Sequence, residues 1–277
     1  MLEAAWWGFV GGASLLLGCA VALLVRVPTR VIGLVMAFGA GVLVSAVAFE
    51  LTEEAYRAAG GLAATAGLLA GSVTFFLGDT LIDRAGGHRR KSPIHGGALP
   101  GREEPGRASA ATASGHSAAA SGGGAAGAVG TVAATGGLAL VLGALLDGIP
   151  ESAAIGISLL DGQGVGIAMV AAVFLSNVPE SLSATTGLKA SGRSTRWILG
   201  LWALVCLAST LASLAGYALL GDASAGTVAF IQTFAAGAIL TMLADTMLPE
   251  AVEHAGPLVG LFTVLGFAIA FLIGAAA

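Results

Sequence analysis

Charged residues are scarce in this 277-residue chain. Asp, Glu, Lys and Arg make up 10% of it, whereas hydrophobic residues make up 56% and glycine occurs 43 times. Soluble domains usually carry about 25% charged residues, so a soluble chain of this length would lack the polar surface to cover itself. The net charge of -4 is small and gives no sign of a nucleic-acid partner. The composition therefore predicts an integral membrane protein in contact with a lipid bilayer.

Cysteine is nearly absent as well. Cys19 and Cys206 lie far apart in apolar runs. They make neither a disulfide framework nor a CxxC metal site, and we expect both to be small buried hydrophobic residues. The N-terminus has no Lys or Arg before its first apolar run, and a secretory signal would need them there. We therefore expect that run to be a retained membrane span.

Long apolar runs are what the chain has in abundance. About 20 apolar helical residues cross a hydrocarbon core of about 30 Å. Eight runs are long enough, and they cover approximately residues 6–25, 31–51, 62–83, 130–160, 163–188, 197–219, 226–249 and 257–275. The expected fold is all-α, a polytopic membrane protein with eight transmembrane helices.

A basic, low-complexity segment separates the first three runs from the last five. We expect helices one to three in residues 1–84, a mobile loop in 85–128, and helices four to eight in 129–277. Of the twelve Lys and Arg residues, only Arg57 lies outside the connections that follow odd-numbered runs. The positive-inside rule then places the 85–128 loop in the cytoplasm and both termini outside the cell membrane.

One phrase occurs twice, in adjacent apolar runs. It reads Asp147-Gly148-Ile149-Pro150-Glu151-Ser152 and then Ser176-Asn177-Val178-Pro179-Glu180-Ser181. Ionisable groups at membrane depth usually mark an ion or substrate path. The acidic residues of the first copy are four positions apart and share a helix face, and the second copy repeats the spacing from Ser176 to Glu180. Two adjacent antiparallel helices would bring these polar groups together near mid-membrane.

Proline adds oxygen ligands to this picture. Pro150 and Pro179 have no N–H, so each frees the carbonyl group one turn earlier in its helix. Carboxylate, amide, hydroxyl and carbonyl oxygens together suit hard or borderline divalent ions. The sequence therefore predicts a metal site made by Asp147, Glu151, Ser176, Asn177 and Glu180. The alternative is a pair of proline-kinked helices whose carboxylates are protonated and simply packed.

Further acidic groups flank that centre along the predicted path. Glu50 lies at the outer end of the second run, and Asp245 and Glu250 lie toward the inner end of the seventh. They would stand at the entrance and exit of an ion pathway. The alternative for the residues at the membrane edges is ordinary solvated charge.

These motifs resemble those of the ZIP (Zrt/Irt-like protein) family of divalent metal transporters. Family members carry His-Asn-x-Pro-Glu-Gly on span four and His-Glu/Asn-x-Pro-Glu on span five, where this chain has its two Pro-Glu phrases. Phe38-Gly39-Ala40-Gly41 resembles the family's span two, and Phe234-Ala235-Ala236-Gly237 resembles span seven. The resemblance covers most of the chain. It implies a 3+2+3 arrangement, in which spans one to three and six to eight form an inverted repeat.

The resemblance implies a transporter that moves divalent transition-metal cations into the cytoplasm by alternating access. The ion (Zn²⁺, Mn²⁺, Fe²⁺ or Co²⁺) is its substrate, and no prosthetic group is expected. Glu151 and Glu180 match the family's metal-binding glutamates. Asp147 and Ser176 stand where the family usually has histidines, and Gly148 stands where a second-metal ligand often is. Because Gly148 provides no ligand, one central ion rather than two is expected. Oxygen ligands lack the preference for zinc that nitrogen ligands give, so the expected range of ions extends from Zn²⁺ to Mn²⁺, Fe²⁺, Co²⁺ and Mg²⁺.

Other functions are compatible with the same polar residues. The main alternative is a non-transporting, metal-sensing or regulatory homologue, because the usual histidines are replaced. A passive channel would use the same polar groups. The chain is not expected to be an enzyme, because it lacks the Gly-x-Gly-Asp and Tyr-Asp pairing of intramembrane aspartyl proteases. Small-residue patterns such as Gly33-x-x-x-Ala37 suit either packing within the bundle or a homodimer interface.

Overall fold

The computed structural model describes residues 1–84, 125–160 and 164–276. Every regular element in these ranges is a helix, so the predicted all-helical fold is confirmed there. The elements are α1 (Leu2–Leu24), α2 (Thr29–Ala46), η1 (Val47–Glu53), α3 (Glu54–Ala59), α4 (Gly61–Arg84), α5 (Ala125–Ile157), α6 (Ile167–Ala190), α7 (Thr195–Leu220), α8 (Ala225–Met242), η3 (Leu243–Met247), α9 (Leu248–Ala255), η4 (Gly256–Leu258) and α10 (Val259–Ala276). Most of the predicted 85–128 loop lies outside the described residues, and its last four positions belong to α5.

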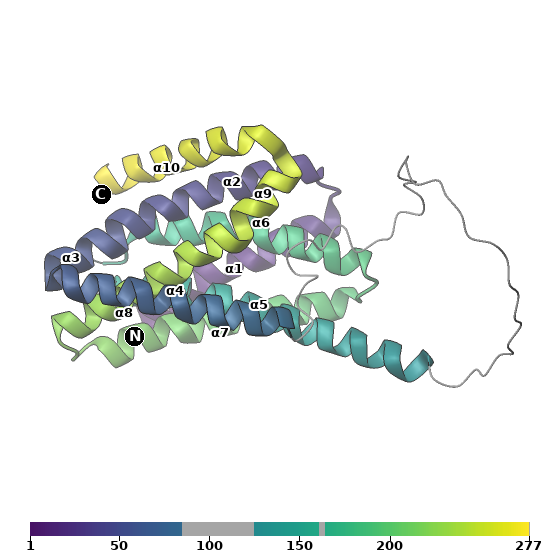
Figure 1. Ribbon diagram of the computed structural model, residues 1–277, viewed down its shortest axis with the longest axis horizontal. Coiled ribbons are helices and arrows are strands. Elements are labelled where there is room, and N and C mark those ends of the chain that lie inside the picture. Colours follow the sequence, from purple (N-terminus) through teal and green to yellow (C-terminus); the bar gives the residue numbers. More distant parts are fainter. Residues whose placement is uncertain (85–124, 161–163, 277) are drawn as a thin grey trace, which may run out of the picture.

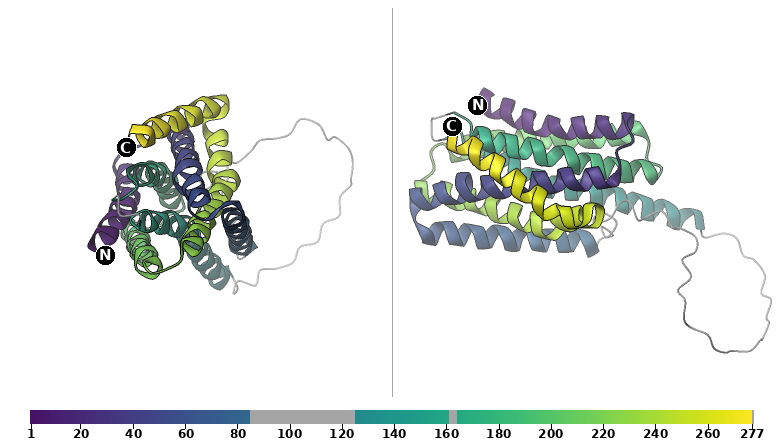
Figure 2. Two further views of the ribbon diagram at one scale, coloured as in Figure 1. Left: turned by 90° about the vertical axis from the view of Figure 1, so that its left-hand side faces the viewer. Right: turned by 90° about the horizontal axis from the view of Figure 1, so that it is seen from above.

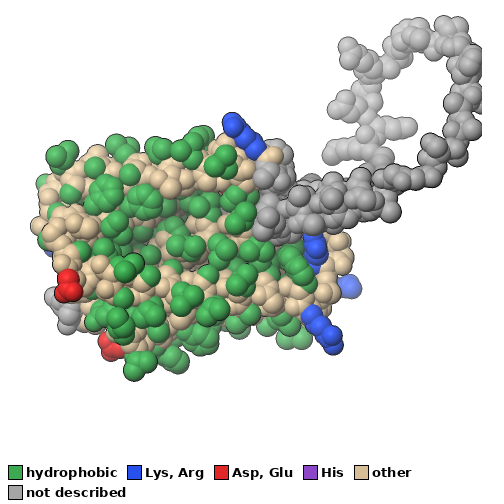
Figure 3. Space-filling model, turned by 90° about the horizontal axis from the view of Figure 1, so that it is seen from below, with side chains coloured by type: hydrophobic (Ala, Val, Ile, Leu, Met, Phe, Trp, Pro, Cys, Tyr) green, Lys and Arg blue, Asp and Glu red, His purple; other side chains and the backbone are tan. Residues whose placement is uncertain are grey.

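The outer surface of the bundle is apolar, as a lipid environment requires. Six described segments are long and apolar enough to cross a membrane, namely Leu2–Leu24, Thr29–Ala59, Gly61–Ile82, Ile167–Ala190, Thr195–Leu220 and Ala225–Ala275. Leucine and other large hydrophobic side chains lie exposed on them, Leu69 by 63% and Leu261 by 68%. Figure 3 shows hydrophobic side chains covering one long face, with Lys and Arg at one end and Asp and Glu at the other. An apolar surface of this extent indicates a membrane-embedded protein.

The long helices pack in two groups. In the first group, α1 packs against α6 and α7, and α7 packs against α5. In the second, α2 packs against α10 and α8 packs against α4. The groups meet where α2 lies along α6 and α8 lies along α5. Figures 1 and 2 show the helices aligned along one common direction, with the N-terminus and the C-terminus at the same end of the bundle.

The second helix group repeats its own backbone pattern after 196 positions. Helices α2 and α8 each have 18 residues and begin at Thr29 and Ala225. Each continues into a π-helical turn, η1 or η3, then into the short helix α3 or α9. Each unit ends at a glycine with positive φ, 80° at Gly60 and 66° at Gly256. Figure 1 shows α2 and α8 running in opposite directions, so the two units form an inverted repeat.

Glycine fixes the same helix crossing in both copies of the repeat. A Cβ atom on Gly41 of α2 would lie 1.8 Å from the carbonyl oxygen of Thr263 in α10. A Cβ atom on Gly237 of α8 would lie 2.1 Å from the carbonyl oxygen of Leu68 in α4. Because glycine has no side chain, two helix backbones can approach this closely. Such close packing stabilises helix pairs in a membrane, where the hydrophobic effect does not drive helices together. Gly41 and Gly237 are themselves 196 positions apart, so the contact is part of the repeat.

Candidate metal-binding site

Three prolines shape the helices that carry the polar groups. Pro150 lies inside α5 and Pro179 inside α6, and both helices continue through them. Pro249 lies in the first turn of α9, directly after the π-helical turn η3. A proline provides no N–H to the preceding turn. At each of these three places, the carbonyl oxygen four residues before the proline therefore receives no hydrogen bond from the proline nitrogen.

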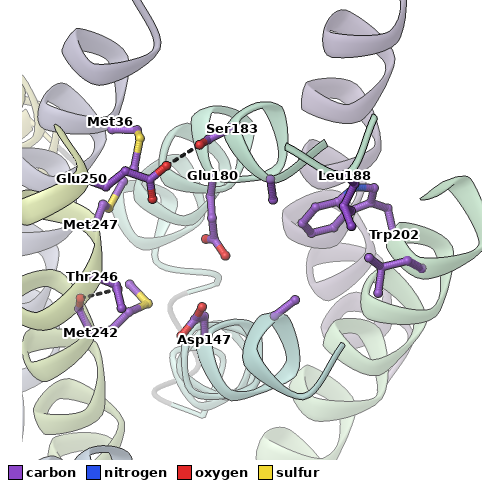
Figure 4. A pocket seen from close by; sticks show the side chains of 13 residues that line it. Met36, Asp147, Glu180, Ser183, Leu188, Trp202, Met242, Thr246, Met247 and Glu250 are labelled. Carbon is purple, nitrogen blue, oxygen red and sulfur yellow. Dashed lines mark hydrogen bonds between the residues drawn. The ribbon is translucent and has the colours of Figure 1, made fainter. Parts of the chain in front are cut away.

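A cavity of about 70 Å³ lies where the two helix groups meet. Its lining comes from both groups and consists of Met36, Ala144, Asp147, Glu180, Ser183, Ala184, Leu188, Leu201, Trp202, Met242, Thr246, Met247 and Glu250. We call it the inner cavity, because Leu188, which lines it, directly precedes the basic Lys189. Figure 4 shows the carboxylates of Asp147 and Glu180 pointing toward one another across this space. The structure thus brings together one acidic residue from each copy of the doubled phrase.

Glu151 lies deeper, one helical turn beyond Asp147. Its side chain is 1% exposed, and neither carboxylate oxygen has a hydrogen-bond partner among the described residues. It lies within electrostatic range of both Glu180 and Asp147, with Ser176 beside it. The Ser176 hydroxyl donates instead to the carbonyl oxygen of Val173, at 3.0 Å. A buried carboxylate without a partner is costly unless it binds a proton or a cation, so Glu151 marks where positive charge would be stabilised.

Asn177 contacts a different helix from the acidic residues. It is 3% exposed, and its Nδ2 atom donates to the carbonyl oxygen of Gly11 in α1, at 3.1 Å. Its Oδ1 atom is therefore the part of the side chain that could approach an ion. Gly148 faces α7, where an added Cβ would come within 3.5 Å of Ser209 Oγ. Position 148 thus points away from α6, and Asp147 is the residue of that pair which lines the inner cavity.

The carboxylates do not form a closed ligand set in this conformation. Within residues 1–84, 125–160 and 164–276, no three His, Cys, Asp or Glu side chains converge closely enough to hold a metal ion. Asp147 and Glu180 border one cavity, and Glu151 is buried beside them. Tight coordination of an ion would require these side chains, or the helices that carry them, to move closer together.

The inner side of the cavity holds one predicted pathway residue and several that the sequence did not indicate. Glu250 lines it, and its carboxylate accepts a hydrogen bond from the Ser183 hydroxyl (Figure 4). Asp245 lies on η3 and is not among the lining residues. Ser183 follows Glu180 by three positions and so extends the polar face of α6, a signal that periodicity could have given. The methionines of the lining carry no such local signal.

A second cavity, of about 1090 Å³, lies at the opposite end of α2. Its lining includes Glu50, Glu53, Glu54 and Arg57, together with the start of α6 and the end of α10. Gln232 of α8 fixes this region, because its Nε2 atom donates to the Glu50 carbonyl oxygen at 3.0 Å and to Glu54 Oε2 at 2.9 Å. The predicted entrance residue Glu50 therefore borders an acidic hollow, which we call the outer cavity.

Comparison of the chain with protein-family models and with curated proteins gives no match. The fold and the site together define an all-helical protein with several helices long and apolar enough to span a membrane. Within that class, the defining feature of this chain is a group of buried carboxylates at the interface between two helix groups.

Proposed function

We propose that this chain is a membrane transporter of the ZIP type, which moves divalent metal cations into the cytoplasm by alternating access. The observation that carries the proposal is the meeting of Asp147 and Glu180 across the inner cavity, with Glu151 buried beside them. Carboxylates at an interface between helix groups can close on a divalent ion when the groups approach and release it when they part. The ion is the substrate of this process.

The proposed layout has eight spans with both termini outside the cell membrane. It counts α5 as one span, the α8–α9 unit as another, and α10 as a third, because the chain reverses at Gly256. Arg26, Arg30 and Lys189 are exposed, and Lys189 Nζ donates to the Leu23 carbonyl oxygen at 3.2 Å, so the ends of α1 and α6 lie together. The positive-inside rule favours the cytoplasm for this end. In this orientation the outer cavity faces the outside and the inner cavity faces the cytoplasm.

The proposed path connects the two cavities. A divalent ion enters past Glu50, sheds water at the central carboxylates and leaves by Asp245 and Glu250. The two helix groups move against one another around the site, and the inverted repeat supplies two related halves for the two conformations. Binding requires deprotonated carboxylates, so the ion and protons compete for the same oxygens.

The test is uptake of Zn²⁺, Mn²⁺, Fe²⁺ and Co²⁺ into proteoliposomes by conservative variants. We expect Glu151→Gln and Glu180→Gln to abolish uptake of whichever ions the wild type carries, because each removes a charge while keeping the side-chain volume. Glu253→Gln is the matched control, since Glu253 is an exposed glutamate on α9 outside the inner cavity. Wild-type uptake by both central variants would refute the site.

A second function, metal sensing without transport, is favoured by one observation. Asp147 and Ser176 occupy the two positions where the ZIP family usually has histidine, and Ser176 directs its hydroxyl to its own helix. A sensor would bind divalent ions to the purified protein and yet carry no flux into vesicles. Titration calorimetry beside the uptake assay separates the two functions.

A further inference from the structure

Three methionines converge on the inner cavity from two different helices. Met36 comes from α2, whereas Met242 and Met247 come from the end of α8 and from η3. They are three of only five methionines in the chain. Figure 4 shows their sulfur atoms on the same side of the cavity as the Glu250 carboxylate, opposite the apolar side chains of Leu188 and Trp202. One wall of the inner cavity therefore combines thioethers with a carboxylate.

Core filling alone does not account for these thioethers. Methionine often fills irregular gaps in cores, and the three side chains are 2%, 3% and 5% exposed. The inverted repeat provides an internal comparison, because each position has an equivalent 196 residues away in the same backbone environment. Those equivalents are Gln232 for Met36, Ala46 for Met242 and Leu51 for Met247. None of these three equivalents is a methionine, so the shared backbone does not require methionine at these positions.

The exchange of Met36 for Gln232 changes what the neighbouring glutamate can bind. At the outer end, Gln232 donates a hydrogen bond to Glu54 Oε2 at 2.9 Å. Glu250 is the repeat equivalent of Glu54, and Met36 stands where the amide would be. A thioether cannot donate a hydrogen bond, but its sulfur is a soft ligand for metal ions. At the inner end the Glu250 carboxylate still accepts a hydrogen bond from the Ser183 hydroxyl, but it shares its cavity with a thioether where Glu54 has an amide.

We propose that Met36, Met242, Met247 and Glu250 form a mixed thioether–carboxylate binding station at the cytoplasmic exit. Thioethers are neutral and polarisable, so they favour soft and borderline cations such as Cd²⁺ over hard ions such as Mn²⁺ and Mg²⁺. The station deepens the proposed function, on which its place in a transport path rests. It shifts the expected substrate range from the hard ions that an oxygen-only centre would admit toward softer transition metals.

Cadmium, as the soft probe, tests the station directly in the purified full-length protein. X-ray absorption at the cadmium edge should show sulfur neighbours in the wild type. The triple variant Met36→Leu/Met242→Leu/Met247→Leu should lose them, because leucine keeps the volume and removes the sulfur. Met169→Leu is the control, since Met169 is buried but lines the outer cavity. Cys19 and Cys206 do not line the inner cavity. If cadmium bound one of them instead, the sulfur signal would persist in the triple variant and would contradict the proposal.

Binding titrations supply the second readout. The triple variant should bind Cd²⁺ about tenfold more weakly, the lower end of the loss caused by removing supporting groups at metal sites, with Mn²⁺ affinity unchanged. Cadmium with only oxygen or nitrogen neighbours in the wild type would overturn the proposal even if the triple variant failed to fold. So would an unchanged Cd²⁺/Mn²⁺ ratio in a folded triple variant. Sulfur coordination without vesicle uptake would refute the proposed transport but support the thioether–carboxylate station. Uptake without sulfur coordination would support transport but refute the station.

Discussion

Replacing Gly237 by alanine is expected to destabilise the protein, although alanine favours helices more than glycine does. The new Cβ would lie 2.1 Å from the Leu68 carbonyl oxygen, whereas real Cβ contacts essentially never fall below 3.0 Å. Helices α8 and α4 must therefore move apart by about 1 Å, and overpacking of this kind costs about 1–3 kcal/mol. Alanine returns about 1 kcal/mol of helix propensity. The expected net loss in the free energy of unfolding is up to about 2 kcal/mol.

The inverted repeat extends this prediction to the equivalent glycine, Gly41. Gly41→Ala should cost a similar amount, because its Cβ would lie 1.8 Å from the Thr263 carbonyl oxygen in the equivalent crossing. Gly260→Ala is the control, since a Cβ there meets nothing within 4 Å, and it should be neutral or stabilising. Unfolding in mixed micelles with increasing SDS, followed by the fluorescence of the four tryptophans, measures all three. Equal stability of Gly237→Ala and Gly260→Ala would refute the close crossing, and opposite effects at Gly41 and Gly237 would refute the repeat.

Three further predictions concern the path itself. Gln232→Leu removes both hydrogen bonds that hold η1 and α3, and loss of the bond to the Glu54 carboxylate alone should cost about 1.5–3 kcal/mol in the same SDS titration. Asp147→His should raise uptake of Zn²⁺ relative to Mn²⁺, because imidazole suits zinc, whereas Ile149→His, at a 45% exposed position, should leave the ratio unchanged. Lowering the outside pH at constant membrane potential should reduce divalent uptake, because protons compete for the central carboxylates; uptake that rises or stays constant from pH 7 to pH 5 would contradict this.

Local sequence patterns predicted where the helices lie, but they did not predict how far each helix continues beyond its apolar run. The predicted runs 62–83 and 197–219 correspond to α4 (Gly61–Arg84) and α7 (Thr195–Leu220), because an apolar run of membrane length has few other structures open to it. The second run ends at residue 51 in the sequence, yet the helical chain continues through η1 and α3 to Ala59. Charged residues at 53, 54 and 57 ended the apolar run without ending the helix. Hydropathy therefore located the helices but not their polar extensions.

The candidate site was predictable where its residues lie on one helix or on two helices that follow one another in the chain. Helical spacing placed Asp147 and Glu151 on one face, and their shared environment with Glu180 follows from two adjacent helices. Asn177 shows the limit of such reasoning, because its bond to Gly11 depends on α1, far away in the chain. Met36 meets the site only through the packing of α2 against α9 and α6. Contacts of that kind depend on the whole fold, so local periodicity could not reveal them.

The inverted repeat is also difficult to detect from the sequence alone. Eight of the 32 paired positions in 29–60 and 225–256 are identical, whereas the lengths of α2 and α8, the π-helical turns and the terminal glycines all correspond. What the two units share is a backbone path and the glycines that permit close crossing. Side chains that face different surroundings have diverged, as Gln232 and Met36 have done. The backbone therefore shows the relation more clearly than the side chains do.

The pairing of Gln232 with Glu54 and of Met36 with Glu250 has an evolutionary consequence. A duplicated unit that still existed as two identical copies would carry every mutation to both faces of the membrane at once. In a single chain each unit mutates alone, so one unit can have an amide that donates a hydrogen bond to its glutamate while the other has thioethers beside its glutamate. If the chain is the proposed transporter, the selectivity of ion release can then change independently of the affinity of ion capture. A lineage could change the metals it accumulates by altering a few residues on one side of the membrane only.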